Sequence, residues 1–140
     1  MVRRGYLQVL DSGKIRLFKS YNPNYGDGEQ ERDFLYVKDA VEMTLFFLDN
    51  SAISGIFNAG TGVARTWNDL SKAVFKAMKR DLSVEYIDMP ASIRDQFQYK
   101  TCAKIDKIRN VGYSKPITSL EEATTDYIQN YLFSNKRLSQ

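Results

Sequence analysis

The residue best suited to bind a charged ligand is Arg32, which stands between a polar loop at residues 19–31 and an apolar stretch that begins at Phe34. The planar guanidinium of an arginine can donate two parallel hydrogen bonds to a phosphate or pyrophosphate, which a lysine cannot do as well. The neighbouring Asp33 leaves a plainer interpretation open, in which this acid simply pairs with a nearby cation. The sequence therefore predicts a phosphate site at Arg32 as one of two readings.

Two further stretches contain residue types that recognise sugars and diphosphates. Phe18, Lys19 and Ser20 place a ring, an ammonium group and a hydroxyl at the end of a predicted strand. Ligand sites commonly combine an apolar wall with a few directed polar groups. Phe97 and Tyr99 lie in an irregular stretch, and aromatic faces stack on nucleobases or sugar rings. The alternatives are a strand end with a solvated lysine, and rings that only close the edge of a core.

A glycine turn at residues 60–62 precedes a predicted helix, as a dinucleotide-binding loop would. In that motif a third glycine allows close packing of the helix on its strand, whereas Arg65 occupies the corresponding position here. The helix also begins later than the motif requires. We therefore interpret the turn as a flexible connection and predict no cofactor-binding residue in it.

The sequence lacks the residues that several kinds of catalysis and ligand binding require. The chain has no histidine and one cysteine, Cys102, which excludes histidine-dependent nucleophilic catalysis and histidine-ligated metal sites. It has no glycine-rich phosphate loop ending in Lys-Ser or Lys-Thr. No tyrosine is followed four residues later by lysine, the spacing that would place both on one helix face. We predict no catalytic and no metal-binding residue.

The bulk properties are those of one ordinary globular domain. The chain has 140 residues, of which 43% are hydrophobic and 26% charged, and its net charge is +3. We expect no nucleic-acid partner because the charge is small and spread out. We expect no membrane partner because the apolar runs are short. The single cysteine is typical of a reducing compartment, so we expect a cytoplasmic protein.

The first half of the chain predicts alternating helices and strands that bring these residues together. We expect a helix at residues 2–11 that ends at Gly13, a strand at 14–18, a strand at 33–37 and a strand at 54–58. From Lys38 the spacing is helical. The apolar face of this helix is formed by Val41, Leu45 and Leu48, widened by Met43, Phe46 and Phe47.

In the second half, two capping boxes mark helix starts, at Thr66 with Asp69 and at Ser119 with Glu122. Between them we expect a strand at 83–87, an irregular stretch at 90–100, and a short helix from Thr101 to Gly112 with Cys102 buried. The last helix runs to about residue 132. The predicted fold class is α/β, with short strands and flanking helices.

Two blocks, RDFLYVKD at 32–39 and GIFNAGTG at 55–62, resemble the second half of extended short-chain dehydrogenases/reductases of the NAD-dependent epimerase/dehydratase family. This class epimerises or dehydrates nucleotide-activated sugars. Further stretches at 16–21, 27–34, 64–70, 85–90 and 97–99 are similar to the ADP-L-glycero-D-manno-heptose 6-epimerase family. The resemblance covers nearly the whole chain, to about residue 132.

The resemblance implies that residues 1–133 form the C-terminal substrate-binding part of such an isomerase, followed by a polar tail at 134–140. The reaction would invert C6 of ADP-D-glycero-D-manno-heptose for the lipopolysaccharide inner core. It proceeds in the family by transient oxidation and hydride return. NADP and the catalytic Tyr and Lys belong to a Rossmann half that is absent from this sequence, so the chain would be inactive alone.

The resemblance also implies which residues touch the ADP-sugar. In the family the contacts arise after the strand that matches 16–18, at the arginine that matches Arg32, and at an aromatic near Phe97, which is usually tyrosine. Phe97 lacks that hydroxyl, so either the contact is only stacking or Tyr99 supplies the polar group. The predicted substrate-binding residues are Phe18, Lys19, Ser20, Arg32, Phe97 and Tyr99.

Alternatives to this function are a sugar-nucleotide epimerase or dehydratase of other specificity, and a non-catalytic remnant or interaction module. The partners that we expect are the ADP-sugar, the missing Rossmann half, or further copies of the chain. Without that half, the segment at 54–58 and an apolar helix face would remain exposed. We therefore expect an isolated chain to be marginally stable or self-associating.

Overall fold

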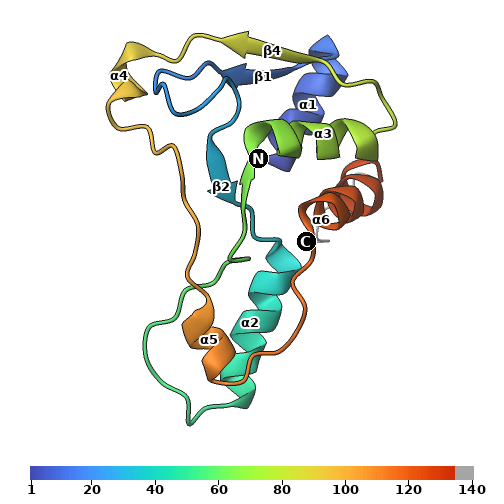
Figure 1. Cartoon of the computed structure of the whole chain (residues 1–140). Helices are drawn as coiled ribbons and strands as arrows, with labels where there is room; N and C mark the ends of the chain where they lie inside the picture. The colour runs from blue at the N-terminus through green and yellow to red at the C-terminus, as the bar shows by residue number, and fades with distance from the viewer. Residues whose placement is uncertain (135–140) are drawn as a thin grey trace.

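The computed structural model describes residues 1–134 and places them in two lobes, an upper and a lower one in Figure 1. The upper lobe contains two parallel strands, β1 (Ile15–Phe18) and β4 (Val84–Ile87), whose register pairs Ile15 with Val84. The predicted strands at 14–18 and 83–87 are confirmed. Of the predicted tail at 134–140, residues 135–140 lie outside the described part of the chain.

Two helices lie next to these strands, α1 (Val2–Ser12) and α3 (Trp67–Ala77), and α6 (Leu120–Tyr127) packs on α3. After Tyr127 the last helix continues as one wider π-type turn, Ile128–Leu132. Helices α1 and α3, strand β1 and the turn after α6 enclose a common apolar core, because the two helices turn their hydrophobic stripes inward. The buried members of this core are Val9, Ile15, Leu17, Val74, Phe75, Ala77, Met78 and Ile128.

The helix boundaries follow local signals in the sequence. Helix α1 ends at Gly13, whose left-handed backbone (φ 71°) lets its amide donate to the carbonyl of Val9 at 3.1 Å. Both predicted capping boxes are formed, with Thr66 capping α3 and Ser119 capping α6. These features depend on residues within one or two turns, so the sequence predicts them well.

A short antiparallel pair, β2 (Glu31–Asp33) with β3 (Ala64–Thr66), lies below the parallel strands in the upper lobe. The strand predicted at 33–37 is therefore wrong in its bounds. Backbone pairing ends at Asp33, and Phe34 packs instead against the edge of the Trp67 ring, with 5.2 Å between ring centroids. Helix α2 then begins at Val37.

The lower lobe consists of α2 (Val37–Asp49), α5 (Asp106–Asn110) and the connecting segment at 50–63. Its small core contains Met43, Ile108 and Tyr113, with Phe46 and Phe47 packed against it. The strand predicted at 54–58 is not formed. A strand needs a neighbour for its backbone groups, and no described segment pairs with this one.

The helix predicted from Thr101 begins only at Asp106. The amide of Thr101 donates to the carbonyl of Glu31 at 3.2 Å, and the amide of Ala103 donates to the carboxylate of Asp33 at 3.0 Å. These contacts with β2 hold residues 101–103 in an extended path. Cys102 therefore lies on the surface, and the prediction that it is buried was wrong.

The α/β fold class is confirmed, and a short four-residue helix, α4 (Ala91–Arg94), interrupts the irregular stretch after β4. Within residues 1–134, no helix is both long enough and apolar enough to cross a membrane.

Candidate functional site

Four of the six predicted substrate-binding residues meet in one cluster of the structure. The Phe97 ring lies at their centre. It contacts the Phe18 ring edge to face, with 6.3 Å between centroids, and the Tyr99 ring, with 5.5 Å. The guanidinium carbon of Arg32 lies 5.3 Å from the centroid of the Phe97 ring. The structure thus joins residues that are up to 81 positions apart in the sequence, from Phe18 to Tyr99.

The backbone of β2 brings this cluster together. The amide of Glu31 donates to the carbonyl of Tyr99 at 2.8 Å, and the segment around Lys100 runs parallel to β2 at this point. The rings of Phe97 and Tyr99 therefore lie beside Arg32, which is the central residue of β2. This pairing could not be read from the sequence, because both segments look irregular there.

Arg32 is half-buried, and its guanidinium has no acidic partner among residues 1–134. Its only hydrogen bond within this part of the chain is to the carbonyl of Glu31, at 2.7 Å. Burial without a counter-ion lowers the pKa of Arg32 below its ordinary value. A partly desolvated arginine in this state favours an anionic ligand, because such a ligand supplies the missing charge.

A cavity of about 400 Å³ lies next to the cluster, between α1, β1 and α3. Its volume lies within the range of small-ligand sites, roughly 300–1,000 Å³. Phe18 and Phe97 form the wall that it shares with the Arg32 cluster. The remaining lining is mostly apolar and includes Trp67, Leu70 and Val74. Such a cavity suits a flat, mainly apolar group attached to the anion.

Gln30 is a polar residue of this cavity that the sequence did not reveal. Only 1% of its surface is exposed, and it lines the cavity. Its side-chain nitrogen makes one long hydrogen bond, 3.4 Å to the carbonyl of Phe18. A buried amide with so little bonding is costly unless a ligand completes it. In the sequence Gln30 is one polar residue of a polar loop, so no signal marks it.

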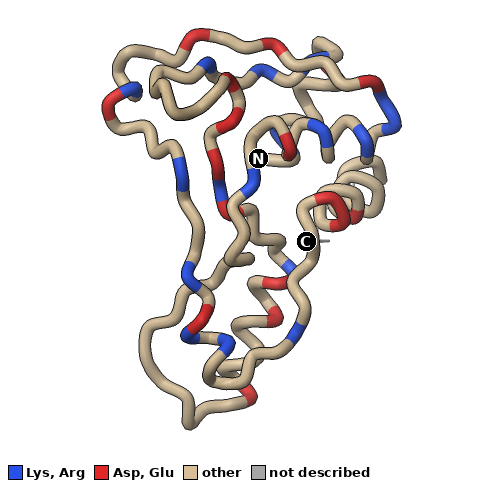
Figure 2. The backbone as a smooth tube through the Cα atoms, viewed as in Figure 1, with Lys and Arg blue, Asp and Glu red and all other residues tan. Residues whose placement is uncertain are grey.

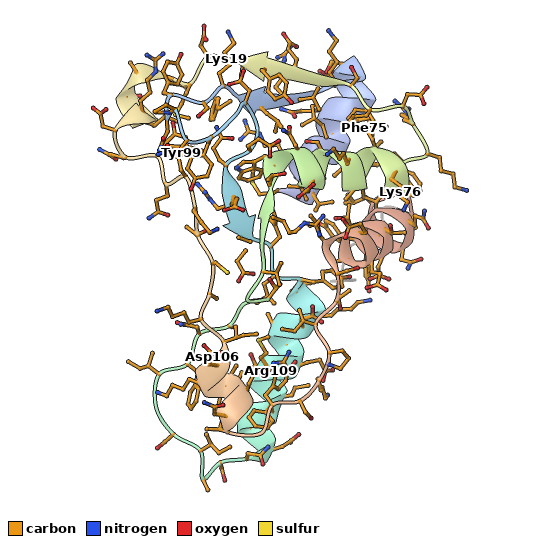
Figure 3. The ribbon with its side chains drawn as sticks, in the orientation of Figure 1. Lys19, Phe75, Lys76, Tyr99, Asp106 and Arg109 are labelled. Carbon is orange, nitrogen blue, oxygen red and sulfur yellow. The ribbon has the colours of Figure 1, made fainter. Side chains whose placement is uncertain are left out.

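Lys19 and Ser20 lie on the same loop but have partners within the chain. Figure 3 shows Lys19 above Tyr99 at the top of the molecule, and its ammonium group pairs with Asp88 at 3.1 Å. This hydrogen bond raises the pKa of Lys19. The Ser20 hydroxyl donates to the carbonyl of Asn22 at 2.9 Å. The structure thus holds both side chains in the loop rather than in the cavity lining.

Tyr99 has a structural task of its own. Its hydroxyl accepts a hydrogen bond from the amide of Tyr21 at 3.0 Å, which fixes the start of the polar loop. Arg94 covers the Tyr21 ring, with its guanidinium carbon 3.9 Å from the ring centroid. Phe97 lines the cavity, whereas Tyr99 does not line it and packs against the Phe97 ring.

The glycine turn at 60–62 is bound by Asp33. The Asp33 carboxylate accepts hydrogen bonds from the amides of Thr61 (2.8 Å), Gly62 (3.1 Å) and Ala103 (3.0 Å), and from the Thr61 hydroxyl (2.7 Å). Burial alone would raise the pKa of Asp33, but these hydrogen bonds outweigh it and the pKa is lowered. The amides that a cofactor pyrophosphate would need are thus occupied.

Arg65, which follows this turn, is also unavailable to a dinucleotide, because its guanidinium forms ion pairs within the chain. Its guanidinium binds Glu121 of α6 at 2.7 Å and Asp69 of α3 at 3.1 Å. The residues of this turn therefore do not fit a nicotinamide dinucleotide.

One tyrosine and one lysine do meet, at the start of α2. The Tyr36 hydroxyl donates to the Asp126 carboxylate, and Lys38 pairs with the same carboxylate at 2.7 Å. Burial and the hydrogen bond to Asp126 raise the pKa of Tyr36 to about 12, and Lys38 and Tyr36 lower that of Asp126 to about 2. Tyr36 is therefore held protonated and is not a base at neutral pH. Residues 1–134 contain no group of side chains suited to hold a metal ion.

Comparisons with known proteins show which class of protein this chain resembles. Residues 8–60 match the sequence model of the NAD dependent epimerase/dehydratase family. The fold agrees: a UDP-N-acetylglucosamine 4-epimerase from Methanobrevibacter ruminantium, solved with UDP-N-acetylmuramic acid, superposes with a TM-score of 0.76 at 21% identity. That match covers 97% of this chain and 40% of the epimerase. The chain therefore has part of the fold of extended short-chain dehydrogenase/reductase epimerases and dehydratases.

Sequence similarity narrows the class further. The chain is 48% identical over 132 residues to the ADP-L-glycero-D-manno-heptose-6-epimerase of Nitratidesulfovibrio vulgaris, and 46% identical over 138 residues to that of Fusobacterium nucleatum. A crystal structure of the Helicobacter pylori enzyme of the same name superposes with a TM-score of 0.73 at 27% identity. The resemblance predicted from the sequence is confirmed. The chain spans 41% of the length of the N. vulgaris protein.

Proposed function

We propose that this chain is the C-terminal, substrate-binding part of an isomerase that converts ADP-D-glycero-D-manno-heptose to ADP-L-glycero-D-manno-heptose. The observation that carries the proposal is the half-buried Arg32, which has no acidic partner in residues 1–134 and lies over Phe97 beside an apolar cavity. An anion joined to a flat ring system, such as ADP, would satisfy both features. The similarity to epimerases that carry this name supports the choice of nucleotide and sugar.

In the proposed complex, Arg32 binds the diphosphate and the adenine enters the 400 Å³ cavity. Phe18 and Phe97 form the apolar wall of the cavity, and Phe97 supplies the aromatic contact by stacking rather than by a hydroxyl. Gln30 offers its amide to the polar edge of the base. Lys19 and Ser20 contribute through the loop that they stabilise, since both side chains already have partners.

The reaction itself requires groups outside this chain. We infer that the remaining part of the enzyme binds NADP and supplies the Tyr and Lys that transfer protons. When bound, the cofactor would accept and return a hydride at the carbon that is inverted. This chain would fix the substrate so that its heptose reaches that site, and alone it would bind without turnover. We further propose that the enzyme works in the cytoplasm, where the exposed, unpaired Cys102 would stay reduced. There it would supply heptose for lipopolysaccharide.

Calorimetric titration with ADP, ADP-ribose and UDP tests this proposal. Arg32→Ala should weaken ADP binding about 10- to 100-fold, the equivalent of one hydrogen-bonded charge, or about 1.5–3 kcal/mol. Arg32→Lys should recover part of the lost affinity, because a lysine keeps the positive charge but cannot donate two parallel hydrogen bonds to the phosphate. Arg3→Ala, on the exposed face of α1, is the matched control and should bind ADP like the unmodified protein.

Two outcomes would contradict the proposal. If ADP does not bind, or if Arg32→Ala binds it unchanged, the chain is a remnant that retains the fold only. If UDP binds more tightly than ADP, the chain belongs to a sugar-nucleotide epimerase or dehydratase of another specificity.

A further inference from the structure

The side chain of Asn68, the second residue of α3, joins three separate parts of the upper lobe. Its amide nitrogen donates to the carbonyl of Asp27 at 3.0 Å and to the carboxylate of Glu29, on either side of Gly28. Its amide oxygen accepts a hydrogen bond from the Tyr86 hydroxyl of β4 at 3.0 Å. The amide is thus fixed between the polar loop on one side and β4 on the other.

Gly28 lets the loop lie directly on the start of α3. Its backbone is left-handed, with a φ of 72°, and a Cβ added to it would lie 2.3 Å from the Asn68 amide oxygen. A residue with a side chain would therefore not fit at this contact. The backbone amide of Asn68 also donates to the carbonyl of Gly28 at 3.0 Å, and that of Trp67 donates to the carbonyl of Gln30 at 3.2 Å. These contacts hold residues 27–30 against the helix.

The same stretch of the loop is acidic, and Figure 2 shows red positions on the trace that runs into β2. Asp27, Glu29 and Glu31 occupy every second position there. An asparagine supplies two donors to this stretch and one acceptor to Tyr86, which neither a lysine nor an aspartate could do. The residue type at position 68 therefore matches the task of joining the loop to β4.

This contact bears on the nucleotide site because the loop carries Gln30 into the cavity. Gln30 follows Glu29 in the chain, is 1% exposed and lines the cavity. Its side chain makes one long hydrogen bond within residues 1–134, 3.4 Å to the carbonyl of Phe18, so the place of its amide depends on the backbone that carries it. Arg32 is instead held by β2, whose register pairs it with Arg65. A looser loop would thus displace Gln30 more than Arg32.

We infer that Asn68 is a positioning residue of the nucleotide site, which fixes residues 27–30 so that the Gln30 amide points into the cavity. The inference rests on the proposed function, in which Gln30 meets the polar edge of the base. Asn68 itself does not line the cavity. It acts on the affinity for the base, whereas the affinity for the diphosphate depends on Arg32. ADP and inorganic pyrophosphate therefore respond differently to a change at Asn68.

Calorimetric titration of Asn68→Ala with ADP and with inorganic pyrophosphate provides the test. We expect ADP to bind roughly five- to tenfold more weakly, the equivalent of about one hydrogen bond, and pyrophosphate binding to stay unchanged. Tyr86→Phe removes only the hydroxyl that orients the amide, and it should weaken ADP binding about two- to threefold. Ser119→Ala is the control, because it removes the cap of α6 and so lowers stability without touching the loop. It should bind ADP like the unmodified chain.

Two further measurements separate positioning from a general loss of structure. In Gln30→Leu the amide is already absent, so the addition of Asn68→Ala should cause no further loss of ADP affinity. Without any ligand, hydrogen exchange at the Gln30 side-chain amide can be followed by NMR. It should be about tenfold faster in Asn68→Ala, because the buried amide gains access to water, and unchanged in Ser119→Ala.

Three results would overturn the inference. The first is ADP binding by Asn68→Ala that equals that of the unmodified chain. The second is an equal loss of affinity for ADP and pyrophosphate, or losses that multiply in the double variant, since either would give Asn68 a general structural role. The third is a loss of ADP affinity in Ser119→Ala as large as that in Asn68→Ala. Absence of ADP binding to the unmodified chain would refute the proposed function and this inference with it, so the two failures are distinguishable.

Discussion

Replacement of Asp33 should weaken the contacts between the upper and lower lobes and lower the free energy of unfolding. Its carboxylate accepts four hydrogen bonds, at 2.7–3.1 Å, from Thr61, Gly62 and Ala103, and so it ties β2 to the glycine turn and to the segment before α5. A hydrogen bond to a charged group contributes about 1.5–3 kcal/mol, and a buried donor left without a partner costs about 1–3 kcal/mol. The four bonds are coupled and Asp33 is half-exposed, so they do not add.

We therefore expect Asp33→Ala to lower the free energy of unfolding by about 3 kcal/mol, close to the upper end for a single substitution. Asp33→Asn should cost about half as much, because its amide oxygen still accepts from some of the donors. The assay is urea unfolding at pH 7, followed by hydrogen exchange at Thr61, Gly62 and Ala103. Asp11→Asn is the control, since Asp11 is exposed and should change stability by less than about 0.5 kcal/mol.

The same carboxylate gives a pH signature. The pKa of Asp33 is lower in the folded chain than its ordinary value of 3.8. Its contribution to stability is thus fully present above the unfolded pKa and is lost as the pH falls through the folded pKa. The difference between the unmodified chain and Asp33→Asn should shrink below about pH 4. A difference that is equal at pH 3 and pH 7, or an Asp33→Ala effect as small as that of Asp11→Asn, would refute this account.

Two further substitutions probe the site and its frame. Gln30→Leu should weaken ADP binding about tenfold in calorimetry, whereas the binding of inorganic pyrophosphate should not change. The reason is that the buried Gln30 amide lines the cavity and does not contact the guanidinium of Arg32. An equal loss of affinity for both ligands would contradict this. Gly60→Ala should destabilise the chain by about 2 kcal/mol in urea, because its added Cβ would overlap that of Ala103, whereas Gly26→Ala has only the flexible side chain of Glu29 nearby and should be near neutral.

The sequence determined the parts of this protein that depend on near neighbours along the chain. The end of α1 at Gly13 and the starts of α3 at Thr66 and α6 at Ser119 are all as predicted. Helical hydrogen bonds join residues four apart, so the capping residues and the apolar spacing that decide them lie within one window. The prediction that Arg32 binds an anion, and the resemblance to sugar-nucleotide epimerases, also came from the sequence without the fold.

The tertiary structure alone decided what depends on distant segments. The strand expected at 54–58 is not formed, and the helix expected from Thr101 is displaced to Asp106, because strand pairing requires a partner elsewhere and β2 takes the backbone of residues 99–103. The same pairing places Phe97 beside Arg32 and exposes Cys102. Burial of Gln30 in the cavity follows from the packing of α1 and α3 around it, which no local pattern encodes.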